Sequence, residues 1–224
     1  MNVTYEQLKN DAQVRAYIEA GNTTLKALGY TEHTFAHVCK TAETAASILT
    51  ELGYSEEEAE FARIAGLLHD IGNMANRTMH ALTGAEMARS ILERTGMPYS
   101  DIGIVCSAIG NHDEETGRPV NSACAAVILA DKSDVRRSRV QKQDMDEILK
   151  DIHDRVNYAV ERSDISVVDT DGKKSIKLCL DIDSHFTQVM DYFEIFLTRM
   201  LMCRRAAAYL GADFELIIND LKIM

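Results

Sequence analysis

Hydrophobic and polar residues alternate with a helical period over most of this chain. Phe61, Ile64 and Leu68 share one face of the segment 55–70, as on an amphipathic helix. Ser55 begins the segment and Glu58 follows three residues later, which is the pattern of a capping box. Similar patterns predict helices over residues 5–28, with a break or bend near Gly21, and over 34–52, 80–94, 98–110, 121–138, 145–161 and 184–210. We therefore expect a mainly α fold.

Residues 163–182 depart from the helical period. Ile165 and Val167 alternate with polar residues, and strict alternation resumes over residues 176–182. Between the two runs stands Asp171-Gly172, a dipeptide typical of a tight hairpin turn. The pattern predicts a β-hairpin set between helices.

We expect two parts in the chain: a helical domain over residues 1–161, and an appendage over 162–224 formed by the hairpin and the last helix. That helix carries a wide stripe of Phe, Met, Leu and Val over residues 186–201. A buried core face is the simplest interpretation of the stripe. Its width would also suit the seam of a homodimer.

The composition is that of an ordinary globular protein. Of 224 residues, 46% are hydrophobic and 26% charged, which is sufficient for a normal core. The formal net charge of −11 argues against a nucleic-acid polymer as the main partner, because neutralising its phosphates needs clustered Lys and Arg. A small phosphorylated substrate remains compatible with this charge, since bound metal ions invert the local field.

We expect a cytoplasmic protein that does not bind membranes. Residues 1–9 lack the basic and apolar regions of a signal peptide, and no apolar run is long enough to span a bilayer. The five cysteines are scattered singly among apolar neighbours, as buried free thiols in a reducing compartment would be.

Histidine and aspartate residues gather in the middle of the sequence. His69 and Asp70 stand side by side at the end of the third predicted helix, close to the core. Five of the seven histidines lie between residues 33 and 112. A single histidine is more often structural than a metal ligand. If all five were structural, however, several imidazoles in or near the core would each need a separate hydrogen-bond partner. The pattern indicates a metal site with room for more than one ion.

The order His37, His69-Asp70, Asp131 resembles the HD-domain superfamily of metal-dependent phosphohydrolases, helical proteins named after the central pair. The resemblance covers residues 31–140. It implies an HD-domain helical bundle in which these four residues bind one divalent ion.

Members of that superfamily with extra histidines bind a second ion. The resemblance assigns His80 and His112 to this second ion and makes Asp70 the bridge between the two. Asp113 is either a further ligand or a group that orients His112. Imidazole and carboxylate ligands suit iron or manganese best, with zinc, magnesium, cobalt and nickel as alternatives. The centre is thus mononuclear or dinuclear, and the extra histidines favour two ions.

One branch of the superfamily cleaves cyclic dinucleotides, and this chain lacks its signature. The Gly-Tyr-Pro run of that branch is missing after His112, and Asn73 stands where those enzymes have Lys. We therefore do not expect cyclic di-GMP to be the substrate.

Two residues join Asp70 as candidates for catalytic roles. His33 lies four residues before His37, so on a helix both would point to the same side. There His33 could contact the substrate or protonate a leaving group, or it could be an ordinary exposed histidine at a helix start. Lys132, beside Asp131, could bind phosphate oxygens or be a surface cation.

Three further residues are candidates for substrate binding. Arg77 precedes His80 and could hold a phosphate, with a surface role as the alternative. Asn73 begins a loop that we expect to form a wall of the pocket. Arg136 belongs to a basic cluster that could bind phosphate, although cations near a helix C-terminus are favourable without any ligand.

From these observations we predict an enzyme that hydrolyses a phosphate ester or anhydride of a nucleotide or small phosphorylated metabolite. The resemblance implies that a metal-activated hydroxide attacks phosphorus in line. Two other functions are compatible with the sequence: a di-iron oxygenase of HD type, and a non-catalytic sensor that binds metal or nucleotide.

Overall fold

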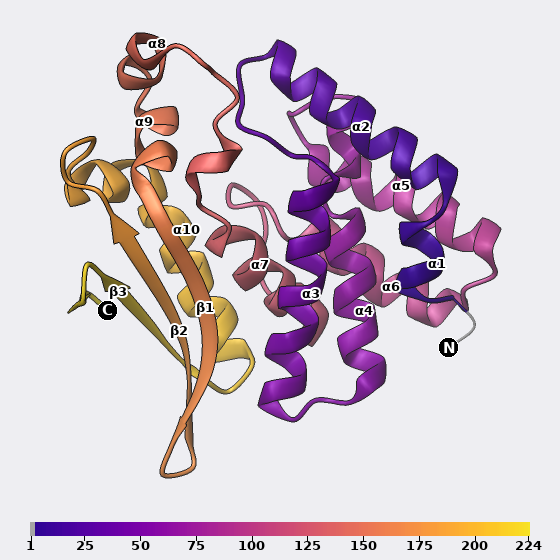
Figure 1. The fold of residues 1–224 in the computed structure, drawn as a ribbon. Coiled ribbons are helices and arrows are strands. Elements are labelled where there is room, and N and C mark those ends of the chain that lie inside the picture. The colour runs from indigo at the N-terminus through magenta and orange to yellow at the C-terminus, as the bar shows by residue number, and fades with distance from the viewer. Residues whose placement is uncertain (1–2) are drawn as a thin grey trace.

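The computed structural model describes residues 3–224 and confirms the mainly α fold (Figure 1). The first elements form the helical body: α1 (Tyr5–Lys9), α2 (Ala12–Ala27), α3 (Phe35–Leu52), α4 (Glu56–Leu68), the 3₁₀ helix η1 (Ile71–Met74), α5 (His80–Thr95), α6 (Tyr99–Gly110), α7 (Ser122–Ser133), the 3₁₀ helix η2 (Arg137–Arg139), α8 (Met145–Lys150) and α9 (Ile152–Ala159). The remaining elements are β1 (Val160–Thr170), β2 (Lys173–Ile182), α10 (Val189–Tyr209), β3 (Asp213–Ile218) and β4 (Leu221–Lys222).

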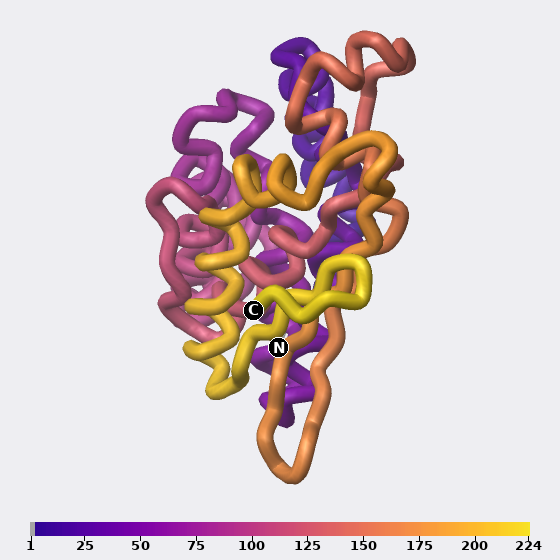
Figure 2. The backbone as a smooth tube through the Cα atoms, turned by 90° about the vertical axis from the view of Figure 1, so that its left-hand side faces the viewer, coloured from indigo at the N-terminus to yellow at the C-terminus, as the bar shows by residue number. Residues whose placement is uncertain are grey.

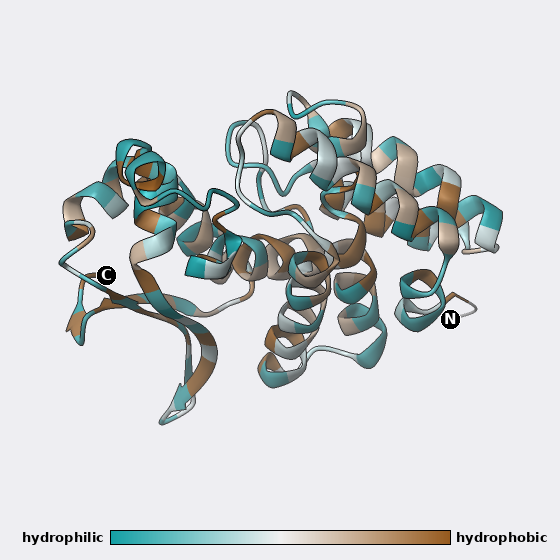
Figure 3. Cartoon of the chain, turned by 45° about the horizontal axis from the view of Figure 1, so that its top comes forward, coloured by the Kyte–Doolittle hydropathy of each residue, from teal (hydrophilic) through white to brown (hydrophobic). Residues whose placement is uncertain are grey.

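Helices α3, α4 and α7 form the centre of the helical body. They pack against one another, and every residue from Ala123 to Ala130 of α7 is buried. Figure 3 shows the most hydrophobic segments at this centre, while the tip of the hairpin is hydrophilic. Small residues permit the close approach: a Cβ atom added to Gly66 of α4 would lie 2.7 Å from the Cα atom of Ala42 of α3.

The sequence correctly predicts both ends of the connection between α3 and α4. Gly53 ends α3 in the left-handed conformation, with a φ of 89°. Ser55 begins α4 with a complete capping box, in which its side chain and that of Glu58 each accept from the other's backbone N–H. The prediction succeeds because these signals are local.

The helix predicted over residues 5–28 is in fact two helices, and the chain breaks before Gly21. The Asp11 carboxylate accepts hydrogen bonds from the backbone N–H groups of Gln13 and Val14, and so caps a new helix. Gly21 lies within α2, where a Cβ atom would come 3.3 Å from the backbone nitrogen of Met74. This glycine therefore allows α2 to pack closely on η1 instead of bending the helix.

Three other predicted helices are shorter than expected. Helix α7 ends at Ser133 and not near residue 138, and the helix predicted over 145–161 is divided into α8 and α9. Asp151 causes the division, because its side chain accepts from the backbone N–H groups of His153 and Asp154. The last helix begins at Val189, five residues later than predicted.

The predicted hairpin belongs to a larger sheet with strand order β1-β2-β3-β4. Strands β1 and β2 pair antiparallel through the predicted Asp171-Gly172 turn, whose residues have φ values of 54° and 81°. Strand β3 pairs parallel to β2, and α10 is the crossover between them. Strands β3 and β4 follow the last helix and are not predicted by the sequence pattern.

Helix α10 joins the sheet to the helical body, since it packs against both β3 and α7. Tyr192, Phe196 and Met200 are buried on it, in agreement with the core interpretation of its apolar stripe, whereas Met190 and Leu197 are exposed. In Figure 2 the β1–β2 turn projects past the helices. Among residues 3–224, no helix combines the length and the apolar character that crossing a membrane requires.

We predict that Gly66→Ala lowers the free energy of unfolding by about 1–3 kcal/mol, because the added methyl group must push α3 and α4 apart. Denaturant unfolding followed by circular dichroism measures the change. The matched control is Gly103→Ala in α6, where an added Cβ meets no atom within 4 Å and should be neutral or stabilising. Equal stability of the two variants would contradict the close packing of α3 on α4.

Candidate metal centre

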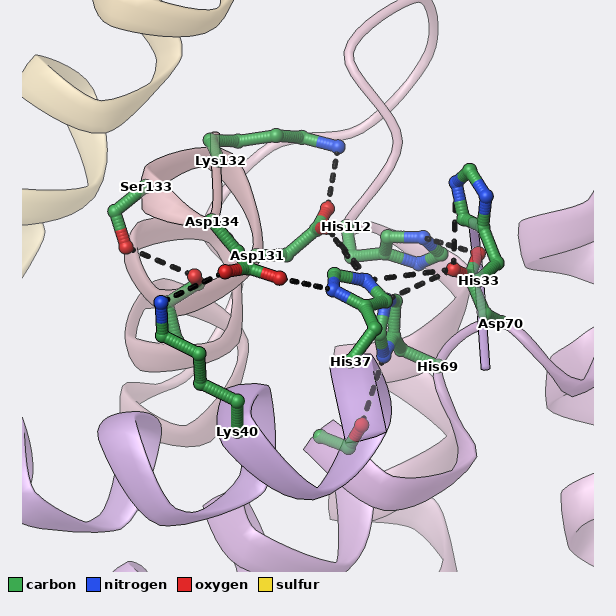
Figure 4. Close-up of polar contacts among 12 residues, drawn as sticks. His33, His37, Lys40, His69, Asp70, His112, Asp131, Lys132, Ser133 and Asp134 are labelled. Atoms are coloured by element: carbon green, nitrogen blue, oxygen red, sulfur yellow. Dashed lines mark hydrogen bonds and ion pairs between the residues drawn. The ribbon is translucent and has the colours of Figure 1, made fainter. Parts of the chain in front are cut away.

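Four predicted ligands converge from three separate elements. His37 comes from α3, His69 and Asp70 from the end of α4, and Asp131 from α7 (Figure 4). The His37 Nε2 atom lies 3.4 Å from Asp131 Oδ1 and 3.7 Å from Asp70 Oδ2. The His69 Nε2 atom lies 3.3 Å from Asp70 Oδ2 and 3.7 Å from Asp131 Oδ1. Two imidazole nitrogens and two carboxylate oxygens therefore surround one small space.

The second oxygen of Asp70 faces a different pair of imidazoles. Asp70 Oδ1 lies 3.5 Å from His80 Nε2 and 4.0 Å from His112 Nε2. The two Nε2 atoms are 3.2 Å apart. His80 begins α5 and His112 follows the end of α6, so two further elements meet here. Asp70 thus stands between two groups of ligand atoms.

The hydrogen bonds of the histidines direct their Nε2 atoms into the cluster. The Nδ1 atom of His69 lies 2.8 Å from the Gly66 carbonyl oxygen, and that of His112 lies 2.6 Å from the Ile109 carbonyl oxygen. A carbonyl can only accept, so each Nδ1 carries a proton, and in the neutral ring Nε2 is the atom with the free lone pair. This is how proteins hold histidines that bind metals.

Among the described residues, two imidazole nitrogens of the cluster lack the hydrogen-bond partner that a buried polar atom needs, as metal-binding atoms do before the ion is bound. The Nε2 atoms of His37 and His69 are buried and have no hydrogen-bond partner among residues 3–224. Such buried polar atoms are rare and destabilising unless something satisfies them. Together with the carboxylates of Asp70 and Asp131, they make a donor set suited to a divalent ion.

Asp134 supports the cluster from behind, and the sequence analysis did not identify it. Its Oδ2 atom accepts a hydrogen bond from His37 Nδ1 at 2.8 Å, and its Oδ1 atom accepts from Lys40 Nζ at 2.8 Å (Figure 4). Arg136 Nε also donates to Oδ1, at 2.9 Å. Although burial disfavours the charged carboxylate, His37 and the nearby Arg139 hold the pKa of Asp134 far below its usual range.

The cluster strongly attracts positive charge. Burial alone would lower the pKa of His69, yet the adjacent Asp70 and Asp131 carboxylates raise it to about 10. Burial likewise opposes ionisation of Asp70 and Asp131, yet neighbouring cationic groups, led by His69 and Lys132 respectively, hold both pKa values well below the usual range. The two carboxylates are therefore ionised, and their field favours a cation beside them.

A cavity of about 490 Å³ opens onto the cluster. Its walls include Asp70, His80, His112 and Asp131 of the cluster and four other predicted site residues: His33, Arg77, Asp113 and Lys132. Helices α9 and α10 complete the walls through Asp154, Asn157, Phe196 and Arg199, which the sequence analysis left out of the site. These residues lie far from the predicted ligands in the sequence, so no local pattern indicates that they belong to the site.

The two predicted catalytic partners of Asp70 both lie beside the cluster. His33 precedes α3 instead of lying on it, and its Nδ1 atom is 2.7 Å from the Thr31 carbonyl oxygen. Its Nε2 atom is 3.9 Å from Asp70 Oδ2, and burial holds the pKa of His33 well below the usual value. Lys132 is buried, with Nζ 2.7 Å from Asp131 Oδ2.

Arg77 and Asn73 lie on the side of Asp70 that faces the second group of imidazoles. Arg77 Nη1 is 3.9 Å from Asp70 Oδ1. The side-chain amide of Asn73 is buried and donates to Asp70 Oδ1 at 2.8 Å, which suits a role in orienting this carboxylate. Substrate binding by either residue stays a prediction.

Arg136 and Asp113 lie farther from the ligand atoms. Arg136 donates to Asp134 and Ser138 and does not line the cavity within residues 3–224. Asp113 lines the cavity, and its Oδ2 atom accepts from the backbone N–H of Glu115 at 3.3 Å. Among the described residues it belongs to none of the close donor groups. Its role as a ligand or as an orienting group stays a prediction.

Comparisons with known proteins agree with this geometry. The model of the HD domain family matches residues 34–159. Three proteins called Ribonuclease Y are similar: that of Opitutus terrae at 32% identity over 119 residues, that of Mycoplasma mycoides at 30% over 128, and that of Thermotoga petrophila at 26% over 194.

These matches cover 52%, 56% and 80% of the present chain, but only 20%, 28% and 37% of the relatives. The chain thus spans little more than a third of their length at most. The family match covers more than half of the chain and includes every ligand of both groups. The chain therefore belongs to the HD domain family of metal-dependent phosphohydrolases.

Proposed function

We propose that this protein hydrolyses a phosphate ester or anhydride of a nucleotide or another small phosphorylated metabolite, at a centre of two divalent ions. The observation that carries the proposal is the position of Asp70, whose two oxygens face two separate pairs of imidazoles. A carboxylate shared in this way sets the distance between two ions that clamp a phosphoryl group.

His37, His69, Asp70 and Asp131 would hold one ion, and Asp70, His80 and His112 would hold the other. When bound, divalent ions lower the pKa of a coordinated water and neutralise charge on phosphoryl oxygens. Imidazole and carboxylate ligands favour iron or manganese for both positions.

The protein's own residues orient the ligands and the substrate. Asn73 fixes Asp70 by its amide, and Asp134 fixes His37 by accepting from Nδ1. In the cavity, the Lys132 ammonium group lies where it can neutralise a phosphate oxygen. His33 Nε2 faces the same space, where the lone pair of the neutral ring could accept a hydrogen bond or a proton from the substrate or an attacking water.

The cavity supports a small substrate. A volume of about 490 Å³ lies within the range of small-molecule sites, which is roughly 300–1,000 Å³. Arg77, Lys132, Arg139 and Arg199 line it and could bind anionic groups, although the whole chain is acidic.

A second candidate substrate is the phosphodiester bond of a short RNA fragment. The name of the similar proteins, Ribonuclease Y, supports it. The net charge of −11 favours a fragment of a few nucleotides over a long polymer, because a long chain would need many more cationic contacts.

We predict close to two metal ions per chain in protein purified without chelators, and almost none in Asp70→Ala, because this variant removes a ligand from both positions. Elemental analysis measures the ratio, and circular dichroism should show unchanged helicity. Asp164→Ala, on the exposed face of β1, is the control and should keep its metal. A full metal content in Asp70→Ala would refute the proposed centre.

Release of phosphate or nucleoside from AMP, short phosphorylated metabolites and the dinucleotide ApA tests the reaction itself. We expect the wild-type protein to hydrolyse at least one of them at the same rate with and without oxygen, and Asp70→Ala to hydrolyse none. Oxygen consumption that accompanies turnover would indicate the oxygenase instead, and tight AMP binding without turnover would indicate the sensor.

His80→Ala should lower the metal content from about two ions to about one per chain, since this residue belongs only to the donor group of Asp70, His80 and His112, whereas His112 also lies close to His69 and Asp131. The first group keeps its two imidazoles and two carboxylates in this variant. The same elemental analysis gives the answer. A ratio that remains at two would return His80 to a structural role.

Replacing Asp134 by alanine should weaken metal binding about 10- to 100-fold, as is typical when the partner of a metal-bound histidine is lost. Asp134→Asn should recover part of this loss, because its amide oxygen can still accept from His37 Nδ1. Calorimetric titration with Mn²⁺ measures the metal affinity of both variants. Lys40→Ala, which removes a different partner of Asp134, is the control. Equal affinities in wild type and Asp134→Ala would contradict the orienting role.

A further inference from the structure

One carboxylate of the cavity lies between two cations, beyond the ligand cluster. Glu114, in the loop between α6 and α7, has its Oε2 atom 2.7 Å from Arg199 Nε and 3.8 Å from Lys132 Nζ. Lys132 Nζ is also 2.7 Å from Asp131 Oδ2. A chain of ion pairs therefore leads from the ligand Asp131 to helix α10.

Packing fixes both cations in position. The guanidinium group of Arg199 lies 4.6 Å from the ring centroid of Phe196, which is buried one helical turn earlier. Lys132 is only 6% exposed and sits on α7, against which α10 packs. The cations are thus held at one wall of the cavity.

The Glu114 carboxylate leaves much of the hydrogen-bonding capacity of these cations unused. Its Oε2 atom and Arg199 Nε are buried, and neither has a well-aligned hydrogen bond within the described part of the chain, although they lie close together. A guanidinium group offers five N–H donors in a planar fork, which a tetrahedral phosphate can engage through two oxygens at once. Glu114 also lies in a loop segment of turns and bends, so its side chain is not locked in a helix or strand.

We propose that the substrate carries a second phosphate group, which displaces the Glu114 side chain and binds Arg199 and Lys132. The scissile phosphate lies at the ligand cluster at the same time, so this inference rests on the proposed function. Glu114 occupies the second phosphate site whenever that group is absent, since its carboxylate is the one ion-pair partner of the Arg199 guanidinium group among residues 3–224.

This arrangement makes the enzyme selective. A substrate with one phosphate leaves Glu114 between the cations and gains nothing from Arg199. A substrate with two phosphates replaces one carboxylate charge by a phosphate of about two negative charges, with stronger hydrogen bonds.

Adenosine 3′,5′-bisphosphate and AMP differ by one phosphate and are the matched probes. Calorimetric titration of each into the 224-residue chain loaded with Mn²⁺ gives their dissociation constants. Arg199→Ala should weaken binding of the bisphosphate about 10- to 100-fold and that of AMP far less, as expected for the loss of a charge-assisted hydrogen bond. Arg199→Lys keeps the positive charge but loses the planar set of N–H donors. Its dissociation constant for the bisphosphate should therefore lie between those of wild type and Arg199→Ala.

Two further variants complete the test. Glu114→Gln removes the competing charge and should tighten bisphosphate binding about 3- to 10-fold, the change expected from losing one partly exposed ion pair. Arg205→Ala changes an exposed arginine of the same helix and is the matched control. It should alter neither dissociation constant.

Each remaining outcome is decisive. If Arg199→Ala weakens both probes equally, or neither, the second phosphate site is refuted. If Glu114→Gln abolishes turnover while binding is kept, Glu114 takes part in the chemistry and its role as a displaced group is wrong. If the bisphosphate binds selectively through Arg199 but no substrate in the panel is hydrolysed, the second site stands and the proposed hydrolysis is refuted.

Discussion

The structure depends on two carboxylates, that of the buried Asp70 and that of the partly buried Asp131, which nearby positive charge stabilises. Asp70 and Asp131 lie among imidazoles at the meeting point of α3, α4 and α7, where burial strongly disfavours a lone anion. Both remain ionised because cationic groups surround them. The same field that raises the pKa of His69 would hold a divalent cation, so the electrostatics of the core and the proposed chemistry have one origin.

The fold supplies this charge arrangement through close packing. Gly66 lets α4 approach α3, and its carbonyl oxygen holds the ring of His69. Asp134 in turn holds His37 and is itself neutralised by Lys40 and Arg136. Helix α10 packs on α7 and adds a wall to the cavity, where it places Arg199. Helix packing, the orientation of the clustered side chains and the walls of the cavity are therefore physically connected.

The sequence predicts those features whose signals are local. The capping box at Ser55 and the His69-Asp70 pair at the following helix end are both readable within a few residues. The break at Asp11 was missed because a single capping aspartate competes there with a continuous helical pattern. Asp134, Glu114 and Arg199 acquire their roles only when distant elements pack together, and β3 pairs with β2 across the whole of α10. Contacts between residues so far apart produce no local pattern in the sequence from which they could be predicted.

The most direct test of the central claim is the anomalous scattering of crystals grown with Mn²⁺. The account predicts two peaks roughly 3.5–4 Å apart, the separation typical of two-metal sites, with Asp70 between them. One peak should lie beside His37, His69 and Asp131, and the other beside His80 and His112. A single peak away from Asp70, or none within this cluster, would contradict the account.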